Sequence, residues 1–284
     1  MTLILDGVLL ADARASALAT RSASIRERRG TPPRLVLIAF AEAGGRVPHT
    51  ERKIRAGTAT GIEVVPLIIP AGMTTGAARD AITRASAGAD GVFLQFPFPT
   101  AIDAEALTAA IPEDLDVDVM TPGRIRRYLS GEDELPPVTV SAGVALLDAY
   151  GVDVRGVDGV VVSEPGPFAA MFREELARRG AGMRETLAPD GAHASAVLNE
   201  AGLVIVSVGK PGAVDASALA TGAVAIDVGY FNAGGRGDIR GDASHLAALA
   251  PVPGGIGPMT VSMLIERTIL FAERSVGAGT ADES

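Results

Sequence analysis

The chain has no cysteine and no tryptophan, and only 4% of its 284 residues are aromatic. Without cysteine, a disulfide framework and a thiolate metal site are both excluded, which is typical of a reducing compartment. With so few aromatic residues, a buried core must consist mainly of Ala, Val, Ile and Leu, as in parallel sheets covered by helices. Hydrophobic residues still make up 48% of the chain, which excludes an intrinsically disordered protein.

Basic charge and long hydrophobic runs are also scarce. The net charge is −9, and such an acidic chain repels nucleic acid, because phosphate binding needs a basic surface. No uninterrupted apolar run reaches the roughly 18 residues that a membrane-spanning helix needs. The first residues, MTLILDGVLL, have no basic segment before the apolar run, unlike a secretory signal. We therefore expect a cytoplasmic protein that contacts neither nucleic acid nor a membrane.

Strand and helix patterns alternate along the chain. Short aliphatic runs predict buried strands at 34–40, 62–69, 91–96, 159–162, 203–209 and 223–229. Helical patterns separate most of them, including residues 10–29, and a long amphipathic helix closes the sequence. This alternation predicts an α/β protein built from βαβ units with parallel sheets. A polar stretch from Pro112 to Pro137 interrupts the pattern, and we interpret it as an irregular connector that ends near a domain boundary.

Two polar residues lie near the expected mouth of the sheet, where α/β proteins bind ligands. Lys53, in ERKIRAG, is a candidate general acid or base whose pKa would be lowered by burial or by neighbouring cations. The alternative is a lysine on the solvated face of a helix. Gln95, in FLQFPFP, is an amide that is costly to bury unless it is hydrogen-bonded. It is either a functional side chain or a core glutamine that bonds the backbone.

Asp116 and Asp118 are two residues apart in LDVDVM, so both carboxylates point to one side if the segment is extended. A divalent cation would need further ligands, and no third carboxylate or histidine is clustered with them. The histidines are too scattered for a metal motif: they are His49, His193 and His245. We therefore predict no metal site. One aspartate can instead accept hydrogen bonds from a polar ring, and the alternative is a pair of surface loop acids.

Two segments rich in glycine and proline precede predicted helices. PVPGGIGPMT would expose backbone amides at the amino end of a helix, with Thr260 as a candidate cap. In GVVVSEPGPF a buried strand turns sharply into a helix, which is where α/β proteins hold nucleotide phosphates. This turn contains Glu164, Pro165 and Pro167 but a single glycine, Gly166.

Taken together, Lys53, LQFPFP, DVDVM, VGKPG, AIDVG and PVPGGIGPMT resemble the methylenetetrahydrofolate dehydrogenase/cyclohydrolase family, collinearly over almost the whole chain. The resemblance implies a two-domain α/β subunit that forms homodimers and acts on a methylene- or methenyl-tetrahydrofolate. Residues 1–138 and 260–284 would form the α/β folate-site domain that carries catalysis. Residues 139–259 would form a Rossmann-like NAD(P)-binding domain with a parallel sheet.

The resemblance also implies roles for individual residues. Lys53 matches the catalytic lysine, Gln95 the glutamine that works with it, and Asp118 the acid that binds the pterin ring. A further set lines the folate site: Pro253, Gly254 and Gly255. His49 stands where the family has a tyrosine, so a stacking ring is replaced by one that titrates near neutral pH, and we count it among the catalytic candidates. Val119 replaces the glycine of the family's DVDG motif.

The predicted dinucleotide site departs furthest from the family. The arginine and serine that hold the cofactor phosphates in the family align with Glu164 and Pro165 here. A carboxylate repels phosphate, and proline has no backbone N–H to donate. We therefore interpret the cofactor site as degenerate, with these candidate residues: Ser163, Glu164, Gly166 and Gly209.

These observations predict a one-carbon enzyme with cyclohydrolase-type chemistry, or release or transfer of a one-carbon unit, whose NADP-dependent dehydrogenase step is impaired. One alternative is an intact bifunctional dehydrogenase/cyclohydrolase that holds NADP in an atypical way. Another is a folate-binding regulatory protein without turnover.

Overall fold

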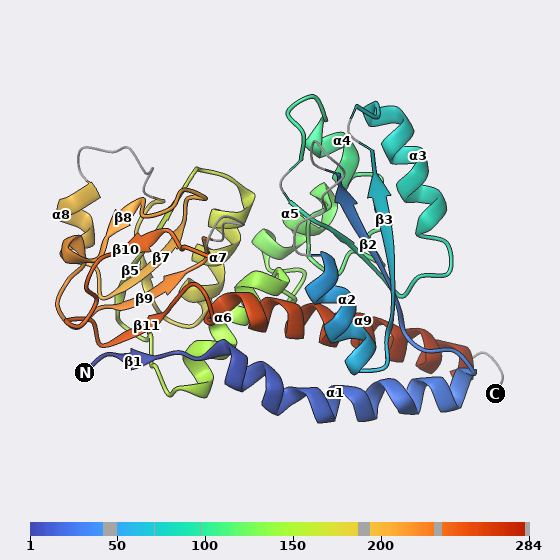
Figure 1. The fold of residues 1–284 in the computed structure, drawn as a ribbon, viewed down its shortest axis with the longest axis horizontal. Helices are drawn as coiled ribbons and strands as arrows, with labels where there is room; N and C mark the ends of the chain where they lie inside the picture. Colours follow the sequence, from blue (N-terminus) through green and yellow to red (C-terminus); the bar gives the residue numbers. More distant parts are fainter. Residues whose placement is uncertain (42–49, 71, 97, 187–193, 230–234, 282–284) are drawn as a thin grey trace. The chain divides into compact units, whose positions relative to one another are not determined.

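The computed structural model describes residues 1–41, 50–70, 72–96, 98–186, 194–229 and 235–281 (Figure 1). The chain divides into two compact units. The three-stranded unit comprises Ala13–Val138 and Val261–Ser284, and the six-stranded unit comprises Met1–Asp12 and Thr139–Thr260. Each unit is named after its main sheet. The α/β fold with parallel sheets that the sequence predicts is confirmed.

The three-stranded unit is built on a parallel sheet in the order β3-β2-β4. β2 (Arg34–Phe40) is central, between β3 (Glu63–Ile69) and β4 (Gly91–Leu94). Every residue of β2 after Arg34 is buried, which is typical of a parallel strand covered on both faces. The described helices that belong wholly to this unit are α2 (Thr50–Ala59), α3 (Thr75–Ala85), α4 (Ala104–Thr108) and α5 (Pro122–Ser130).

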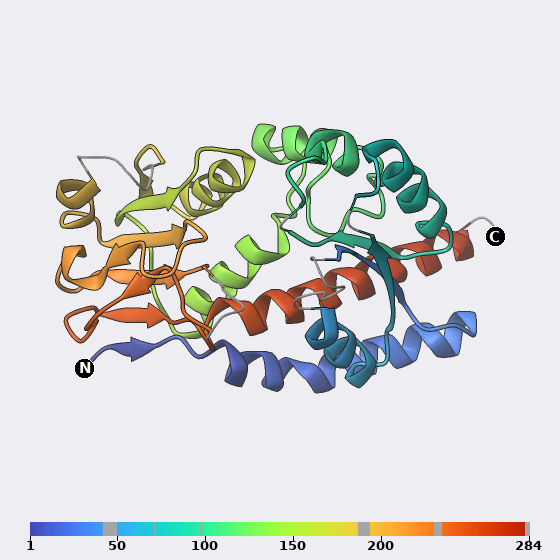
Figure 2. The same cartoon turned by 45° about the horizontal axis from the view of Figure 1, so that its top comes forward.

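Most of two long helices also belongs to this unit. α1 (Gly7–Arg29) and α9 (Ile256–Ala281) run side by side in both views (Figures 1 and 2). Within the three-stranded unit, Arg14 and Arg21 of α1 form ion pairs with Glu266 and Glu273 of α9, at 2.5 and 2.8 Å. Partly exposed ion pairs of this kind contribute little each, so apolar packing must supply most of the stability.

The six-stranded unit is built on a sheet in the order β1-β11-β9-β7-β5-β6, in which all neighbouring strands are parallel. Its strands are β1 (Leu3–Ile4), β5 (Asp158–Ser163), β6 (Gly182–Met183), β7 (Leu203–Ser207), β9 (Val224–Asp227) and β11 (Ala248–Ala250). The chain leaves β5 for β6 on one side and then crosses to β7 on the other. The carboxyl ends of β5 and β7 therefore flank the topological switch point, where open α/β sheets bind ligands.

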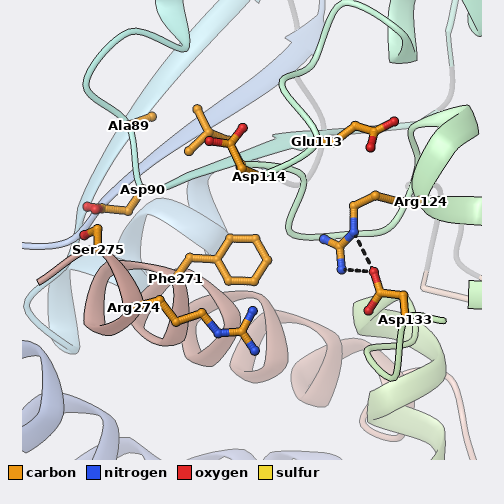
Figure 3. Close-up of a pocket in the computed structure, with 10 residues that line it drawn as sticks. Ala89, Asp90, Glu113, Asp114, Arg124, Asp133, Phe271, Arg274 and Ser275 are labelled. Carbon is orange, nitrogen blue, oxygen red and sulfur yellow. Dashed lines mark hydrogen bonds and ion pairs between the residues drawn. The ribbon is translucent and has the colours of Figure 1, made fainter. Parts of the chain in front are cut away.

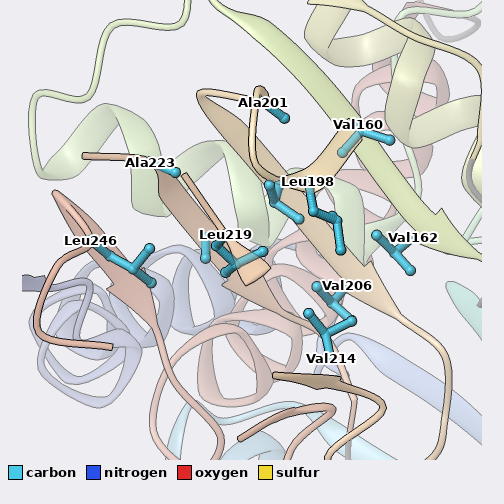
Figure 4. Close-up of a cluster of buried hydrophobic side chains, with 11 residues drawn as sticks. Val160, Val162, Leu198, Ala201, Val206, Val214, Leu219, Ala223 and Leu246 are labelled. Atoms are coloured by element: carbon cyan, nitrogen blue, oxygen red, sulfur yellow. The ribbon is translucent and has the colours of Figure 1, made fainter. Parts of the chain in front are cut away.

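The connections of this unit are short elements. They are α6 (Val138–Ala149), α7 (Pro167–Arg178), α8 (Ala194–Leu198), a 3₁₀ helix (Ala216–Ala218) and a separate parallel pair, β8 (Val214–Asp215) with β10 (Ile239–Arg240). Figure 4 shows the buried cluster on one face of the main sheet, to which alternate residues such as Val160 and Val162 of β5 contribute. Its buried members are all Val, Leu or Ala, as the composition predicts.

The compact units divide the start of the chain differently from the predicted domains, whose assignment stays a prediction. Residues 1–12 were expected in the folate-site domain, but they belong to the six-stranded unit. The cause is backbone pairing, because the N–H groups of Leu3 and Leu5 donate to carbonyls of Ala247 and Leu249, both at 2.9 Å. β1 thereby becomes the edge strand beside β11.

Two further expectations about local structure were wrong. The polar stretch interpreted as an irregular connector contains α5, which begins with Pro122 and ends before Gly131, a residue with a φ of 83°. α9 begins at Ile256, so Thr260 is inside the helix rather than its cap, and its Oγ1 donates to the carbonyl of Ile256 at 3.1 Å. Within the described ranges, no helix is both long and apolar enough to cross a membrane.

Candidate functional site

Lys53 and Gln95 are in direct contact in the three-stranded unit. Lys53 Nζ, on α2, donates a hydrogen bond of 2.8 Å to Oε1 of Gln95, directly after β4. The backbone N–H of Gln95 continues the sheet ladder by donating to the carbonyl of Ile38 at 2.8 Å, which fixes where its side chain begins. The lysine thus points into the carboxyl edge of the sheet rather than into solvent.

The surroundings of Lys53 favour its neutral form. Burial lowers the pKa of Lys53 to about 8, Asp118 opposes this shift and Arg52 adds to it. Its Nζ is also 5.2 Å from the centroid of the Phe93 ring, which favours the cation. Phe93 of β4 and Gln95, directly after it, are two residues apart on a backbone that continues the sheet ladder, so their side chains point to the same face. A lysine with a pKa near 8 can accept and return a proton close to neutral pH.

Asp118 is the third predicted residue of this group. The residue is 9% exposed, and its Oδ1 accepts a hydrogen bond of 2.8 Å from the N–H of Val138. Burial raises the pKa of Asp118 to about 7, and the negative charge of Asp116 adds to this, whereas Val138, Arg267 and Lys53 lower it. Lys53 and Asp118 therefore act on each other's charge, and the structure brings Lys53, Gln95 and Asp118 into one unit.

Asp116 does not pair with Asp118 as an extended segment would allow. Its two carboxylate oxygens accept from the N–H groups of Asp118, Met120 and Thr121, at 3.3, 2.9 and 2.8 Å. Val119, at the centre of this turn, has a φ of 56°. That conformation favours glycine, and a β-branched residue adopts it only under strain. Asp116 therefore stabilises the turn as a hydrogen-bond acceptor, and the carboxylate of Asp118 is not used for this purpose.

The glycine segment that would line the folate site forms the turn from β11 into α9, in the six-stranded unit. The Val252–Pro253 peptide bond is cis, and Gly254 has a φ of 103°. A side chain at Gly255 would meet the carbonyl oxygen of Pro251 at 2.6 Å. Gly254 also accepts a backbone hydrogen bond of 2.8 Å from Gly7. Glycine is therefore required at 254 by conformation and at 255 by space.

The turn between β5 and α7 begins at the switch point, because Ser163 is paired with Ser207 at the end of β7. The hydroxyl of Ser163 donates to the carbonyl of Glu164 at 3.0 Å, so it is already engaged. Glu164, Pro165 and Gly166 are exposed, and α7 begins with Pro167, with no side-chain hydrogen bond at its cap.

Gly209 lies in a loop whose amides already bind a carboxylate. Asp238, which is fully buried, accepts from the N–H groups of Val208, Gly209 and Lys210, at 2.6, 3.0 and 3.0 Å. The neighbouring Asp227 in turn accepts from the N–H of Asp238 at 3.0 Å, and burial raises the pKa of Asp227 to about 6. Asp238 has no distinctive signal in the sequence, because an aspartate after a glycine loop carries no characteristic spacing.

A cavity of about 430 Å³ in the three-stranded unit is separate from this chemistry (Figure 3). It includes Asp90, which precedes β4, whereas Gln95 follows that strand. Within its lining, Arg124 Nη2 pairs with Asp133 Oδ2 at 2.7 Å, whereas Asp90 and Glu113 pair with arginines outside the lining. The Phe271 ring projects into it. Lys53, Gln95 and Asp118 do not line this cavity, so it is not the site that the sequence predicts.

His49 lies outside the described residues. The structure instead adds Arg267, a buried arginine on α9 that acts on Asp118. Its neighbours three and four residues away along the helix are Met263, Leu264, Leu270 and Phe271. A charged residue on that apolar stripe was the signal that would have identified it.

The six-stranded unit has the doubly wound sheet of nucleotide-binding domains, and the three-stranded unit carries side chains suited to proton transfer. Fold and site together define a two-domain α/β protein with one domain of dinucleotide-binding architecture. Residues 137–276 match the family profile of the tetrahydrofolate dehydrogenase/cyclohydrolase NAD(P)-binding domain, and residues 5–118 match that of its catalytic domain. The chain belongs to the tetrahydrofolate dehydrogenase/cyclohydrolase family.

Relatives of known name cover nearly the whole chain. The chain is 31% identical over 285 residues to the bifunctional protein FolD of Streptococcus pneumoniae, with 97% of this chain and 99% of the relative covered. A solved structure of the Trypanosoma brucei methylenetetrahydrofolate dehydrogenase-cyclohydrolase, complexed with NADP and an inhibitor, is 27% identical and superposes with a TM-score of 0.86, over 97% and 98% of the two chains. The Campylobacter jejuni FolD structure has a TM-score of 0.87 at 23% identity, covering 97% of this chain and all of that one, and supports the fold.

Proposed function

We propose that the chain is a methenyltetrahydrofolate cyclohydrolase in which Lys53 and Gln95 carry the chemistry and hydride transfer to NADP is weakened. The hydrogen bond from Lys53 Nζ to Gln95 Oε1 carries this proposal, because it holds a lysine of lowered pKa at the carboxyl edge of a sheet. Family membership supports a tetrahydrofolate as the substrate.

Hydrolysis adds water to the cationic methenyl carbon and then opens the ring. As the water oxygen bonds to that carbon, the neutral form of Lys53 accepts the proton that leaves. With a pKa of about 8, roughly a tenth of the lysine is neutral at pH 7. When the C–N bond breaks, the ammonium of Lys53 returns the proton to the departing nitrogen. Gln95 keeps Nζ in place throughout, because its oxygen accepts from either form of the lysine.

Asp118 serves binding rather than proton transfer. An ionised carboxylate is an acceptor only, so it complements the amino group and ring N–H of a pterin. Its pKa of about 7 leaves about half of Asp118 ionised at pH 7, and donors on the ligand favour that form. By the same family resemblance we assign the segment Pro253, Gly254 and Gly255 to the lining of the folate site.

The turn from β5 into α7 supports a weakened dehydrogenase step. A dinucleotide diphosphate needs donors and positive charge, but the exposed carboxylate of Glu164 repels it, and Pro165 and Pro167 have no N–H. The Ser163 hydroxyl donates to the neighbouring carbonyl instead. These residues do not fit a diphosphate, so we assign no step of the reaction to NADP.

An intact bifunctional enzyme is the second candidate. The Trypanosoma brucei relative binds NADP, and the relatives named FolD are bifunctional. The N–H groups of Phe168 and Ala169, in the first turn of α7, have no acceptor within the helix, and such amides can bind a phosphate. An unusual arrangement of NADP on these two amides would preserve hydride transfer.

Two assays separate the candidates. The absorbance of methenyltetrahydrofolate, followed with and without protein, should fall faster with the wild type and not with Lys53→Ala. Formation of NADPH from methylenetetrahydrofolate should be slow compared with this hydrolysis. Comparable rates would favour the bifunctional enzyme. Folate binding without either reaction would instead indicate a regulatory binding protein and reject the proposal.

A further inference from the structure

Arg267 is a charged side chain buried where a helix normally places apolar residues. It is 7% exposed, on α9, and belongs to the three-stranded unit. Burying a guanidinium is costly unless it has partners that use its charge and its donors. Its contacts therefore indicate what it does.

One contact of Arg267 reaches the backbone that holds Asp118. Its Nη2 donates to the carbonyl of Pro136 at 3.1 Å. Two residues further on, the N–H of Val138 donates to Oδ1 of Asp118 at 2.8 Å. Arg267 thus anchors the short segment that presents the N–H group to the carboxylate.

Arg267 also acts on Asp118 through its charge. Five influences on the carboxyl are resolved: burial and Asp116 raise the pKa of Asp118, whereas the Val138 N–H, Arg267 and Lys53 lower it. Burial and the nearby Arg124 lower the pKa of Arg267 itself to about 10, while Asp118, Asp133 and Glu266 oppose that shift. Arg267 therefore remains a cation at neutral pH.

We propose that Arg267 is a positioning residue that keeps Asp118 both in place and ionised, and so sets the pH range in which the protein binds the pterin ring. The ligand assignment rests on the proposed function. The effect on Asp118 does not, because both the backbone anchor and the charge act in the ligand-free protein.

The test uses Arg267→Gln, which keeps a neutral donor, and Arg267→Lys, which keeps the charge. The matched control is Arg274→Gln, which removes the same charge from an exposed position on α9. The first readout is the titration of the Asp118 carboxyl by ¹³C NMR in ligand-free protein. In Arg267→Gln the midpoint should rise by about one pH unit, and in Arg267→Lys and Arg274→Gln it should stay near the wild-type value.

The second readout is the Kd for tetrahydrofolate, which has no one-carbon unit to react. A rise of one unit in the midpoint lowers the ionised fraction of Asp118 about fivefold at pH 7, so the Kd of Arg267→Gln should rise about fivefold there. The difference should vanish near pH 9, where Asp118 is ionised in both proteins. In an Asp118→Asn background, Arg267→Gln should not change the pH dependence of Kd.

The two readouts test different claims: the NMR midpoint tests the effect of Arg267 on Asp118, and the Kd tests the proposed ligand. An unchanged NMR midpoint in Arg267→Gln overturns the inference, whether or not the protein binds folate. A shifted midpoint in a protein that binds no tetrahydrofolate overturns the proposed function and leaves the role of Arg267 on Asp118 intact. If Arg267→Gln does not fold, Arg267→Lys provides the test. This variant keeps the charge, so its midpoint and Kd should stay near the wild-type values. A midpoint about one pH unit higher, or a Kd about fivefold higher, would refute a role for the charge.

Discussion

Lys53 Nζ and Gln95 Oε1 are joined by a hydrogen bond of 2.8 Å between α2 and the residue that follows β4. This bond makes the two side chains one functional group. Lys53→Met should lower the cyclohydrolase rate by about 10² to 10⁴, the usual contribution of a positioned acid or base. Once Lys53 is removed, Gln95→Leu should cost little more, because the two residues act together.

The decay of methenyltetrahydrofolate absorbance measures both effects. Arg55→Met is the control, because Arg55 is exposed on the same helix and forms a surface ion pair with Glu51, at 3.6 Å. It should retain the wild-type rate. If Lys53→Met kept more than a tenth of the wild-type rate, Lys53 would not be the catalytic acid or base.

Asp118 should make the protein less stable as the pH rises through the acidic range. Its pKa is 3.8 in an unfolded chain and about 7 in the folded protein. Between these values the folded state binds more protons, so the free energy of unfolding falls from about pH 4 to pH 7 and then levels off. Asp118→Asn removes this term. It should match the wild type near pH 4 and exceed its stability at pH 8 by on the order of 2 to 4 kcal/mol.

Urea denaturation across this pH range measures the difference. The titration of Asp227 occurs in both proteins and cancels in the comparison. Equal stabilities at pH 8 would mean that the Asp118 carboxylate is better solvated than its burial indicates.

The turn at Val119 should prefer glycine to alanine. Its φ of 56° costs an L-residue about 1 to 2 kcal/mol, and only glycine escapes this cost. Val119→Gly should therefore be more stable than Val119→Ala by about 1 kcal/mol, although both lose buried methyl groups. At Val117, which is equally buried but is not among the residues of positive φ, the order should reverse. Thermal denaturation of the four variants gives both comparisons, and alanine ahead of glycine at both positions would show that Val119 is unstrained.

The sequence predicts β2 with the bounds that the structure shows, because breakers flank a continuous aliphatic run. It does not predict α5, whose polar surface hides the helical pattern. The usual end signals were nevertheless present, with Pro122 at the first helical position and Gly131, φ 83°, directly after the last. The sequence also does not predict β1 at the start of the chain. Its two residues form a strand only by pairing with β11, far along the chain.

The residues of the candidate site were also predicted only in part. Lys53, Gln95 and Asp118 were identified by family motifs, and the structure shows that they share one unit. Arg267 and Asp238 were not, because their importance comes from what they contact rather than from spacing. The apolar stripe around Arg267 indicates burial, but its role depends on the opposite backbone, here the carbonyl of Pro136, which the sequence does not place beside it.

The turn after β5 should limit the affinity for NADP. Glu164→Gln removes a charge that repels phosphate, and Pro165→Ala restores an N–H donor, so each should tighten NADP binding several-fold and the double variant by about tenfold or more. Calorimetric titration with NADP and NAD measures the Kd of each protein. The opposite finding, tight NADP binding by the wild type that neither change improves, would place the diphosphate elsewhere.

The loop after β7 depends on the carboxylate of Asp238, which accepts three consecutive backbone N–H groups, from Val208, Gly209 and Lys210. Asparagine has one acceptor oxygen, so Asp238→Asn turns an N–H of its own toward at least one backbone donor. Because Asp238 is fully buried, we expect the free energy of unfolding to fall by about 2 to 4 kcal/mol. Asp242→Asn is the control, because exposed Asp242 accepts from the N–H of Ser244 at 2.9 Å and should lose less than about 1 kcal/mol. Urea denaturation measures the stabilities, and faster hydrogen exchange of the amides at 208–210 would locate the defect. Equal losses in the two variants would mean that Asp238 is not what holds this loop.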